Sequence, residues 1–173
     1  MELDGKAAAI LVEDQYNELE LWYPLYRLRE AGARTFTVGT GKPAYRSKVG
    51  LEAKAERDAA QVSPEDFDVL VIPGGWAPDL MRRYEPMVRL VAETAKRGKI
   101  IAAICHAGWL LASANVLRGK RATSFPSIRD DVRNAGAEWV DAEVVVDGNL
   151  ITSRKPDDLP AFCREIIRLA SKR

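Results

Sequence analysis

The chain has 173 residues, of which 47% are hydrophobic and 29% are charged, and this size and composition are typical of one globular domain, here residues 1–173. The 26 Lys and Arg residues nearly balance the 25 Asp and Glu residues, and the net charge of +1 argues against a nucleic-acid partner. No apolar run approaches the roughly 18 residues of a membrane helix, and the polar, acidic start of the chain does not resemble a signal peptide, so we expect a cytoplasmic protein without a membrane partner.

Strand and helix patterns alternate along the whole chain. Short continuous apolar runs indicate strands buried on both faces of a sheet, and apolar residues at helical spacing indicate amphipathic helices. In the first half of the chain, the pattern predicts strands at 7–12, 35–38 and 68–72, a helix at 19–31 and a helix start at 63–66. The polar stretch at 44–60 is ambiguous and is interpreted as a hairpin. In the second half, it predicts strands at 99–104 and 121–125, helices at 87–97, 109–114, 128–135 and 157–169, and a hairpin at 142–153 that turns at Gly148-Asn149. This alternation predicts an α/β fold with a parallel sheet covered by helices on both faces.

Three loops are expected to carry the functional residues. In open α/β sheets, ligands bind outside the carboxyl ends of the strands. The loops at that edge of the predicted sheet are residues 13–18, 73–79 and 105–108. Every residue for which we predict a chemical role lies in one of these loops.

Cys105 is the candidate nucleophile. It lies directly between a buried strand and a helix, where a sharp turn lifts a side chain above the sheet. Backbone N–H groups and the helix dipole at such a turn favour a thiolate and stabilise a developing oxyanion. The second cysteine, Cys163, falls in the last predicted helix, where a buried structural thiol is expected. Two cysteines do not make a disulfide framework.

His106 is the single histidine of the chain, so any Cys/His mechanism within one subunit must use it. Its side chain is a candidate acceptor for the thiol proton, and its backbone N–H is a candidate oxyanion donor. A histidine base needs a group that orients its ring, and Asp79 is the candidate, within the chain or across a subunit boundary. The alternative role for Asp79 is to cap a helix that begins near Pro78.

The Gly74-Gly75 pair ends a predicted strand. Glycines let the backbone approach a ligand closely and present an N–H group, although an ordinary strand-ending turn is the alternative. With one histidine and no HExxH pair, no metal site is expected. No Walker loop occurs, and the glycines at 39–41 do not open an amphipathic helix, so no cofactor is expected.

Several short motifs resemble those of one protein family. They are Glu20–Pro24, Pro73-Gly74-Gly75, Ala103-Ile104-Cys105-His106, Arg118-Gly119, Asp130-Asp131, Glu138–Asp141 and Val144–Asn149. Together they span nearly the whole chain, which resembles the PfpI-type intracellular proteases of the ThiJ/PfpI superfamily. The resemblance implies a flavodoxin-like three-layer sandwich, similar to the class I glutamine amidotransferases, with Cys105 on a nucleophile elbow.

The resemblance also implies roles for residues around Cys105. In the family, the residue that matches His106 pairs with an acidic residue of a neighbouring subunit, and that position falls on Asp79. Assembly into homodimers or hexamers would then complete the site. Gly75 and the backbone of His106 match the family's oxyanion donors.

The sequence departs from the family near the nucleophile. The family usually places a glutamate that hydrogen-bonds the nucleophile's sulfur, and alignment through Tyr23-Pro24 places Asn17 at that position. An amide donates a hydrogen bond but does not shuttle a proton. Either Asn17 or, after a shift of one residue, Glu18 is therefore expected to face Cys105. Trp76 and Trp109 are expected to narrow or reshape the rim of the site.

Three functional hypotheses follow. The leading hypothesis is a cysteine-dependent hydrolase of peptides or other amides, with Cys105 as nucleophile and His106 as acid and base. The second is a cofactor-free glyoxalase or protein deglycase that acts on methylglyoxal or its adducts and needs a proton-carrying carboxylate near the sulfur. The third is a stress chaperone or redox sensor without catalytic activity, in which Cys105 is oxidised.

Overall fold

A seven-stranded sheet forms the centre of the computed structural model, which describes residues 1–173. In sheet order, the strands are β10 (Val144–Asp147), β11 (Leu150–Ser153), β7 (Ile100–Ile104), β6 (Val69–Ile72), β1 (Ala7–Leu11), β2 (Arg34–Gly39) and β5 (Arg57–Asp58). Neighbouring strands are parallel except β10 and β11, which pair antiparallel. The carboxyl ends of the parallel strands therefore meet at one edge of the sheet.

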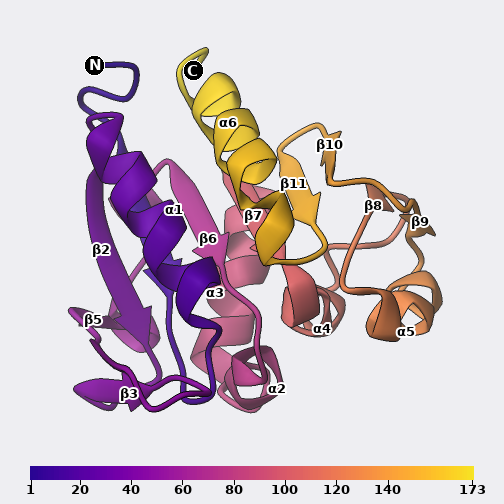
Figure 1. The fold of residues 1–173 in the computed structure, drawn as a ribbon, viewed down its shortest axis with the longest axis horizontal. Coiled ribbons are helices and arrows are strands. Elements are labelled where there is room, and N and C mark those ends of the chain that lie inside the picture. Colours follow the sequence, from indigo (N-terminus) through magenta and orange to yellow (C-terminus); the bar gives the residue numbers. More distant parts are fainter.

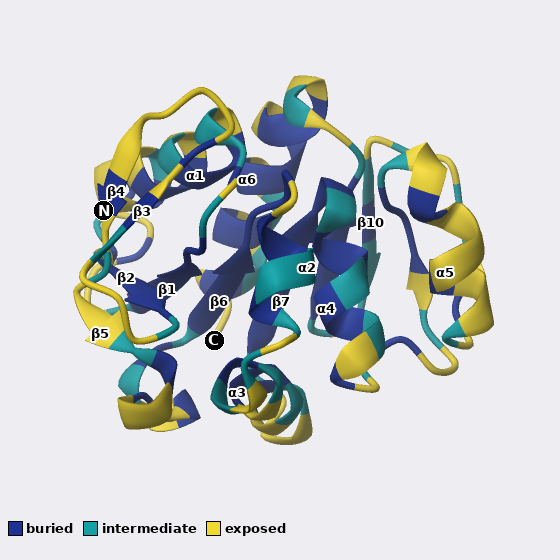
Figure 2. Cartoon of the chain, turned by 90° about the horizontal axis from the view of Figure 1, so that it is seen from below, coloured by how far each residue is buried: buried dark blue, intermediate teal, exposed yellow.

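Helices cover both faces of the sheet. They are α1 (Glu18–Glu30), α2 (Ala77–Met81), α3 (Glu85–Lys96), α4 (Gly108–Ser113), α5 (Arg129–Asn134) and α6 (Leu159–Ala170). α1 and α6 lie side by side on one face, and α3 lies on the other (Figure 1, Figure 2). The structure is the three-layer α/β sandwich that the sequence predicts.

Apolar side chains explain why the central strands form. β1, β6 and β7 consist almost entirely of Val, Leu, Ile and Ala, and every residue in them is buried. A strand covered by helices on both faces needs no polar alternation, and burial of its apolar surface contributes about 25 cal/mol per Å². A single cluster of buried side chains connects the sheet to both helical layers. The loops at the carboxyl edge therefore stand on a rigid platform.

The helix start predicted at 63–66 produces only one 3₁₀ turn. The sequence signal is present, because the Ser63 side chain caps the turn and Asp66 accepts a hydrogen bond from the Ser63 backbone. The chain becomes extended again at Phe67, whose side chain is buried in the core. Burial of this aromatic ring ends the element before an α-helix can form.

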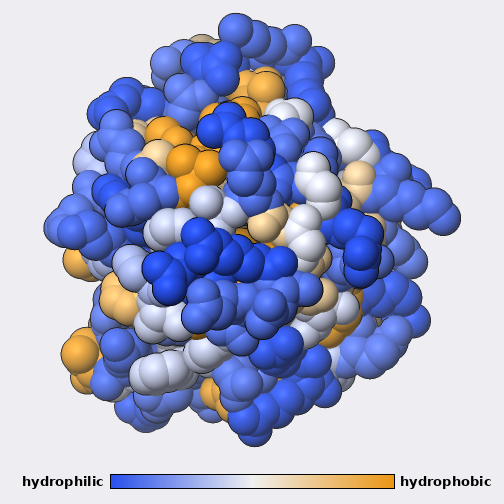
Figure 3. Space-filling model, turned by 90° about the vertical axis from the view of Figure 1, so that its right-hand side faces the viewer, coloured by the Kyte–Doolittle hydropathy of each residue, from blue (hydrophilic) through white to orange (hydrophobic).

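The segment between β8 (Arg121–Ala122) and β9 (Glu138–Trp139) projects beyond the β10 side of the sheet (Figure 1). β8 and β9 pair with each other and not with the central sheet, so the strand predicted at 121–125 ends after two residues. Hydrophilic residues make up most of the surface at this end of the molecule (Figure 3). The excursion is solvated on its outer side, and only its inner loop reaches the carboxyl edge of the sheet.

Two small elements complete that edge. The hairpin predicted within 44–60 forms from β3 (Ala44–Arg46) and β4 (Glu52–Lys54). The sequence offered a helix near Pro78 only through the alternative role of Asp79, and α2 forms there with five residues, too few to show helical periodicity. No helix of the structure combines the length and the apolar character that crossing a membrane requires.

Candidate active site

Cys105 occupies a strained turn at the carboxyl end of β7. Ile104 is extended, whereas Cys105 has a φ of 63°, a left-handed conformation that costs a non-glycine residue on the order of 1–3 kcal/mol. The backbone N–H of Phe125 donates to the Cys105 carbonyl oxygen at 3.0 Å and helps to hold this conformation. The residue is only 7% exposed. The turn has the elbow geometry that raises a nucleophile above a sheet.

The helix that follows the elbow is as short as the sequence predicts. A 3₁₀ turn covers Cys105–Ala107, and α4 begins at Gly108 and has six residues. A helix dipole arises from aligned peptide units, and a helix of this length therefore adds little electric field at the thiol. Individual N–H groups are therefore more important for stabilising charge on Cys105.

Two backbone N–H groups point at the Cys105 thiol. Hydrogen bonds from the N–H groups of Gly75 and His106 both lower the pKa of this thiol, which opposes the larger effect of its burial. Gly75 has a φ of 75°, and a side chain there would overlap the carbonyl oxygen of Gln15. Gly75 also pairs with Tyr16 in an isolated bridge, which joins the loop after β6 to the loop after β1. The two N–H groups form an arrangement that can hold a negatively charged oxygen.

The carboxylate that faces Cys105 belongs to Glu20, in the first turn of α1. Its side chain is fully buried, and Oε2 accepts a hydrogen bond from the Gly74 N–H at 2.7 Å. Burial raises the pKa of Glu20 to about 7, although hydrogen bonds to the Gly74 backbone and the Cys105 thiol act in the opposite direction. Gly74 allows this approach, because a Cβ there would lie 2.5 Å from Glu20 Oε2 and 2.7 Å from the Cys105 Cβ. A carboxyl group that titrates near neutral pH thus adjoins the sulfur.

The expectation that Asn17 or Glu18 faces the sulfur is wrong. Asn17 caps α1, with Oδ1 accepting hydrogen bonds from the N–H groups of Leu19 and Glu20 at 3.1 and 3.3 Å. Glu18 accepts a hydrogen bond from the Val49 N–H at 3.1 Å, away from the thiol. Asn17 thus caps the helix and Glu18 holds the loop at Val49, and the carboxyl group that faces the thiol is that of Glu20.

The sequence does contain a signal for Glu20. Positions 20, 24 and 28 share one face of a helix, because residues four apart lie above one another. Pro24 and Leu28 are buried on that face. A charged residue on the same helix face as two apolar residues is expected to be buried with them. Buried ionisable groups are commonly functional.

The Cys105 thiol and the Glu20 carboxyl group form a coupled acid pair. Burial and, to a smaller extent, the charge of Glu20 together raise the pKa of Cys105 to about 12. At neutral pH the pair therefore holds at least one proton, because two adjacent negative charges in a buried site are unfavourable. A thiolate forms most readily when the proton moves from sulfur to Glu20, so the carboxyl group can accept the thiol proton and later return it.

His106 lies beside the thiol and among aromatic rings. Its Nδ1 is 3.2 Å from Cys105 Sγ, and its ring centroid is 5.2 Å from that of Trp76, 4.9 Å from that of Trp109 and 5.0 Å from that of Phe125. Burial lowers the pKa of His106, so the imidazole is neutral at pH 7. Trp76, which is 50% exposed, and the partly buried Trp109 lie beside His106, and their effect on the rim of the site stays a prediction.

Asp79 does not contact His106 within the chain. It lies inside α2, pairs with Arg83 one turn later, and does not act as the N-cap of the helix, a position held by Trp76. An approach of Asp79 to His106 of a neighbouring subunit therefore stays a prediction about an assembly. In the single chain, the Ser127 hydroxyl lies 3.3 Å from His106 Nε2. Neither periodicity nor a motif distinguishes Ser127, and sequence reasoning missed it.

Comparisons with known proteins agree on one family. The sequence matches the pattern of the DJ-1/PfpI family over residues 6–169. A deglycase of Thermococcus kodakarensis is 44% identical over 160 residues, which make up 92% of this chain and 96% of the deglycase. A Bacillus subtilis protein named "Putative cysteine protease YraA" is 40% identical over 167 residues, or 95% of this chain and 98% of that protein.

A solved structure gives the same result. A two-domain protein of Anabaena variabilis, with a DJ-1/ThiJ/PfpI-like domain and a ferritin-like domain, is similar with a TM-score of 0.92 and 41% identity. The match covers 95% of this chain and 48% of that protein. This chain therefore spans about half the length of the two-domain protein and nearly the whole length of its two sequence relatives.

Proposed function

Because the chain belongs to the DJ-1/PfpI family, we propose that it is a cysteine-dependent enzyme that converts 2-oxoaldehydes such as methylglyoxal, or their adducts, into 2-hydroxy acids. The observation that carries this proposal is the buried Glu20 carboxyl group, which adjoins the Cys105 thiol and has a pKa of about 7. Such a group can both accept and donate a proton at neutral pH. The name deglycase, given to a relative that is 44% identical, supports the same chemistry.

The first step is addition of the thiol to the aldehyde. Cys105 Sγ bonds to the aldehyde carbon, and the thiol proton passes to Glu20 and then to the new oxygen, which gives a hemithioacetal. The N–H groups of Gly75 and His106 stabilise that oxygen while it is negatively charged.

The remaining steps are an internal proton transfer and a hydrolysis. Glu20 removes a proton from the former aldehyde carbon and returns it to the neighbouring carbon. The hydroxyl proton moves from the former aldehyde oxygen to the former ketone oxygen, so the hemithioacetal becomes a thioester of the 2-hydroxy acid. The oxygen of one water molecule then bonds to the thioester carbon, the carbon–sulfur bond breaks, and the sulfur regains a proton. Methylglyoxal plus water thus gives lactate, and Cys105 ends as a thiol.

Amide hydrolysis is the second candidate function, and one contact favours it. His106 Nδ1 lies 3.2 Å from Cys105 Sγ, close enough to pass a proton to a leaving amine. The lowered pKa of His106 makes the imidazole neutral at pH 7, and a neutral imidazole is a weak acid. We therefore place peptidase chemistry behind the 2-oxoaldehyde reaction. The raised pKa of Cys105 limits oxidation and nucleophilic attack alike, so it does not separate a redox-sensor role from the two enzyme reactions.

One assay compares both activities in the same metal-free protein. Lactate formation from methylglyoxal and cleavage of a fluorogenic peptide are measured for wild type, Cys105→Ala and Glu20→Gln, with Cys163→Ala as the matched cysteine control. The proposal expects lactate formation that both site variants lose and the control keeps. Peptide cleavage that requires Cys105, without lactate formation, would select amide hydrolysis instead.

A second assay separates free aldehyde from adducts as substrate. Methylglyoxal adducts of an amine release the aldehyde spontaneously, so removal of free methylglyoxal alone can mimic repair. If the enzyme acts on the adduct itself, the adduct disappears faster than its spontaneous dissociation, measured with an excess of a chemical scavenger. If the adduct disappears no faster with the enzyme than with the scavenger, the substrate is the free 2-oxoaldehyde alone.

A further inference from the structure

Both nitrogens of the His106 ring have a hydrogen-bond partner within the chain. Nδ1 lies 3.2 Å from Cys105 Sγ, and Nε2 lies 3.3 Å from Ser127 Oγ. Rings of Trp76, Trp109 and Phe125 surround the imidazole. Within the single chain, two polar contacts and aromatic packing therefore set the orientation of the ring.

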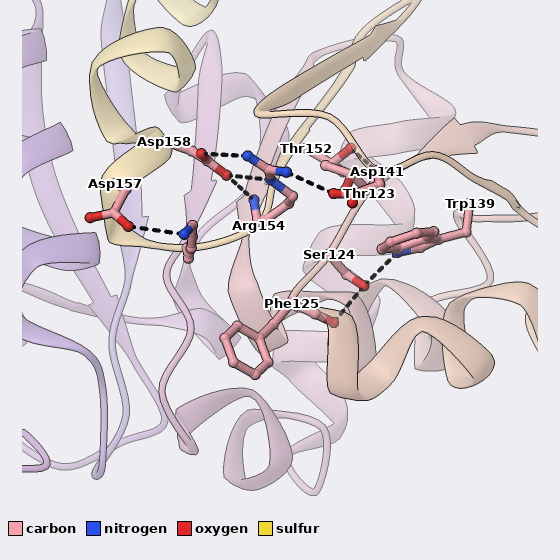
Figure 4. Close-up of polar contacts among 10 residues, drawn as sticks. Thr123, Ser124, Phe125, Trp139, Asp141, Thr152, Arg154, Asp157 and Asp158 are labelled. Carbon is pink, nitrogen blue, oxygen red and sulfur yellow. Dashed lines mark hydrogen bonds and ion pairs between the residues drawn. The ribbon is translucent and has the colours of Figure 1, made fainter.

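The segment that carries Ser127 is anchored at several points. The Thr123 N–H donates to Thr152 Oγ1 at 2.9 Å, which ties the segment to β11 (Figure 4). Trp139 Nε1 donates to Ser124 Oγ at 3.0 Å, which ties it to β9. The short 3₁₀ turn with Ser127 follows directly. A hydroxyl on a turn held in this way can orient a neighbouring ring.

Ion pairs fix the surrounding loops as well. Arg154, which follows β11, bonds to Asp158 at 2.9 Å and to Asp141 at 2.7 Å (Figure 4). These bonds connect the start of α6 with the loop that follows β9. The excursion that bears Ser127 is therefore held to the main body of the protein at a second place.

A hydroxyl and a carboxylate would have different effects on His106. A carboxylate favours the charged imidazolium, whereas a hydroxyl donates to a neutral ring and accepts from a charged one. Burial lowers the pKa of His106 most, Lys48 beside β3 lowers it too, and Asp131 of α5 raises it, while Glu20 lies beyond the thiol. The lowered pKa favours the neutral imidazole, and the function of a neutral ring depends on which nitrogen bears the single proton.

We propose that Ser127 positions His106, by donating its hydroxyl proton to Nε2 and so keeping the ring proton on Nδ1, beside Cys105 Sγ. Nδ1–H then faces the sulfur and whatever group is bound to it. The catalytic importance of this proton rests on the proposed function, but the hydrogen bond and the tautomer do not. The same Nε2 position is the one that Asp79 of a neighbouring subunit would occupy, so the two residues are competing candidates.

Nuclear magnetic resonance of the imidazole nitrogens tests the proposal directly, because His106 is the single histidine of the chain. At neutral pH, wild type is expected to show a neutral ring protonated on Nδ1. Ser127→Ala is expected to shift the ring toward the Nε2–H form, and Ser127→Thr to keep the wild-type spectrum. Ser171→Ala, at the exposed end of α6, is the matched control and should change nothing.

Kinetics and titration supply the functional readout. Ser127→Ala is expected to lower kcat about tenfold, the factor that corresponds to about 1.4 kcal/mol, with little change in KM. Ser127→Thr should restore most of the rate. Ser127→Asp is expected to raise the pKa of His106 by about one unit or more, because a carboxylate at this distance favours the imidazolium.

Two results would overturn the proposal. One is an unchanged imidazole spectrum in a folded Ser127→Ala variant. The other is a change in the imidazole spectrum that Asp79→Asn produces, that depends on protein concentration, and that Ser127→Ala does not produce. This result would assign Nε2 to the partner's Asp79. If wild type forms no lactate, the proposed function fails while the spectra still decide the role of Ser127.

Discussion

The two cysteines of this protein have similar burial and different surroundings. Burial raises the pKa of both Cys105 and Cys163 to about 12, and their residues are 7% and 1% exposed. Cys163 lies in regular helix within α6 and belongs to the apolar core. Cys105 has a left-handed backbone, two N–H donors at its sulfur, and both Glu20 and His106 within reach. Burial alone therefore does not distinguish a nucleophile from a structural thiol.

The difference lies in where the thiol proton and the resulting charge can go. At Cys105, Glu20 can take the proton, and the N–H groups of Gly75 and His106 can stabilise negative charge. At Cys163, the only charge that affects the thiol is that of Arg27, and its effect is smaller than that of burial. A site that can ionise on demand needs both an acceptor and donors, and only one end of the sheet provides them.

Replacing the two cysteines in turn should give the largest contrast. Cys105→Ala is expected to lower the rate of lactate formation by about 10⁴-fold or more, because the bond to substrate cannot form. Cys163→Ala is expected to leave the rate within about twofold of wild type, since it lies outside the site. The ratio of the two rates checks the comparison, and equal losses in two folded variants would contradict it.

Glu20→Gln should separate activity from stability. Loss of the proton carrier is expected to lower the rate roughly 10²–10⁴-fold and to remove the rise in wild-type activity that occurs as Glu20 ionises around pH 7. The glutamine keeps an acceptor for the Gly74 N–H, so the fold is preserved. A pH–rate profile that keeps its limb near pH 7 in this variant would assign that limb to another group.

The same variant is expected to be more stable than wild type at high pH. Folding raises the pKa of Glu20 from its ordinary value of 4.5 to about 7, so the folded protein binds the proton more tightly. Below pH 4.5, Glu20 is protonated in both the folded and the unfolded protein. Between pH 4.5 and 7, the buried charge increasingly lowers the free energy of unfolding, and above pH 7 this loss reaches about 3 kcal/mol. Urea unfolding at pH 5 and pH 8 measures this, with the gain from Glu20→Gln expected mainly at pH 8.

Gly75→Ala tests the N–H donors at Cys105. Its φ of 75° and the adjacent Gln15 carbonyl oxygen both oppose a side chain, so the loop must shift and the N–H must leave the thiol. We expect a loss of activity of roughly 10²-fold and a loss of stability of at least about 2 kcal/mol. Gly98→Ala, also at positive φ but with open space around it, controls for the backbone strain alone.

The smallest effect is expected at the structural thiol. Cys163→Ala removes one buried sulfur atom from the core, and the cavity should lower the free energy of unfolding by about 1 kcal/mol.

Iodoacetamide should label Cys105 at rising rates as pH increases and should label Cys163 only after denaturation. Prompt labelling of native Cys163 would show that the two thiols differ less than their surroundings indicate.

Local patterns in the sequence were sufficient for the framework. Continuous apolar runs located β1, β6 and β7, because a strand covered on both faces must be apolar throughout. The elbow at Cys105 was predictable for a similar reason, since it lies where one such run meets a helical pattern. Predictions stayed open where an element was too short to show a period, as at α2, and failed where one buried ring ended it, as at Phe67.

The sequence by itself determined the order of the elements, the class of fold and the candidate nucleophile, because these depend on residues that are neighbours along the chain. The tertiary structure decided which carboxyl group lies beside that thiol and which hydroxyl lies beside His106. Glu20 faces Cys105 through the rotation of α1 against the sheet, and Ser127 reaches His106 through a loop anchored to β9 and β11. These contacts join segments far apart in sequence, and packing of the layers, not local pattern, sets which side chains meet.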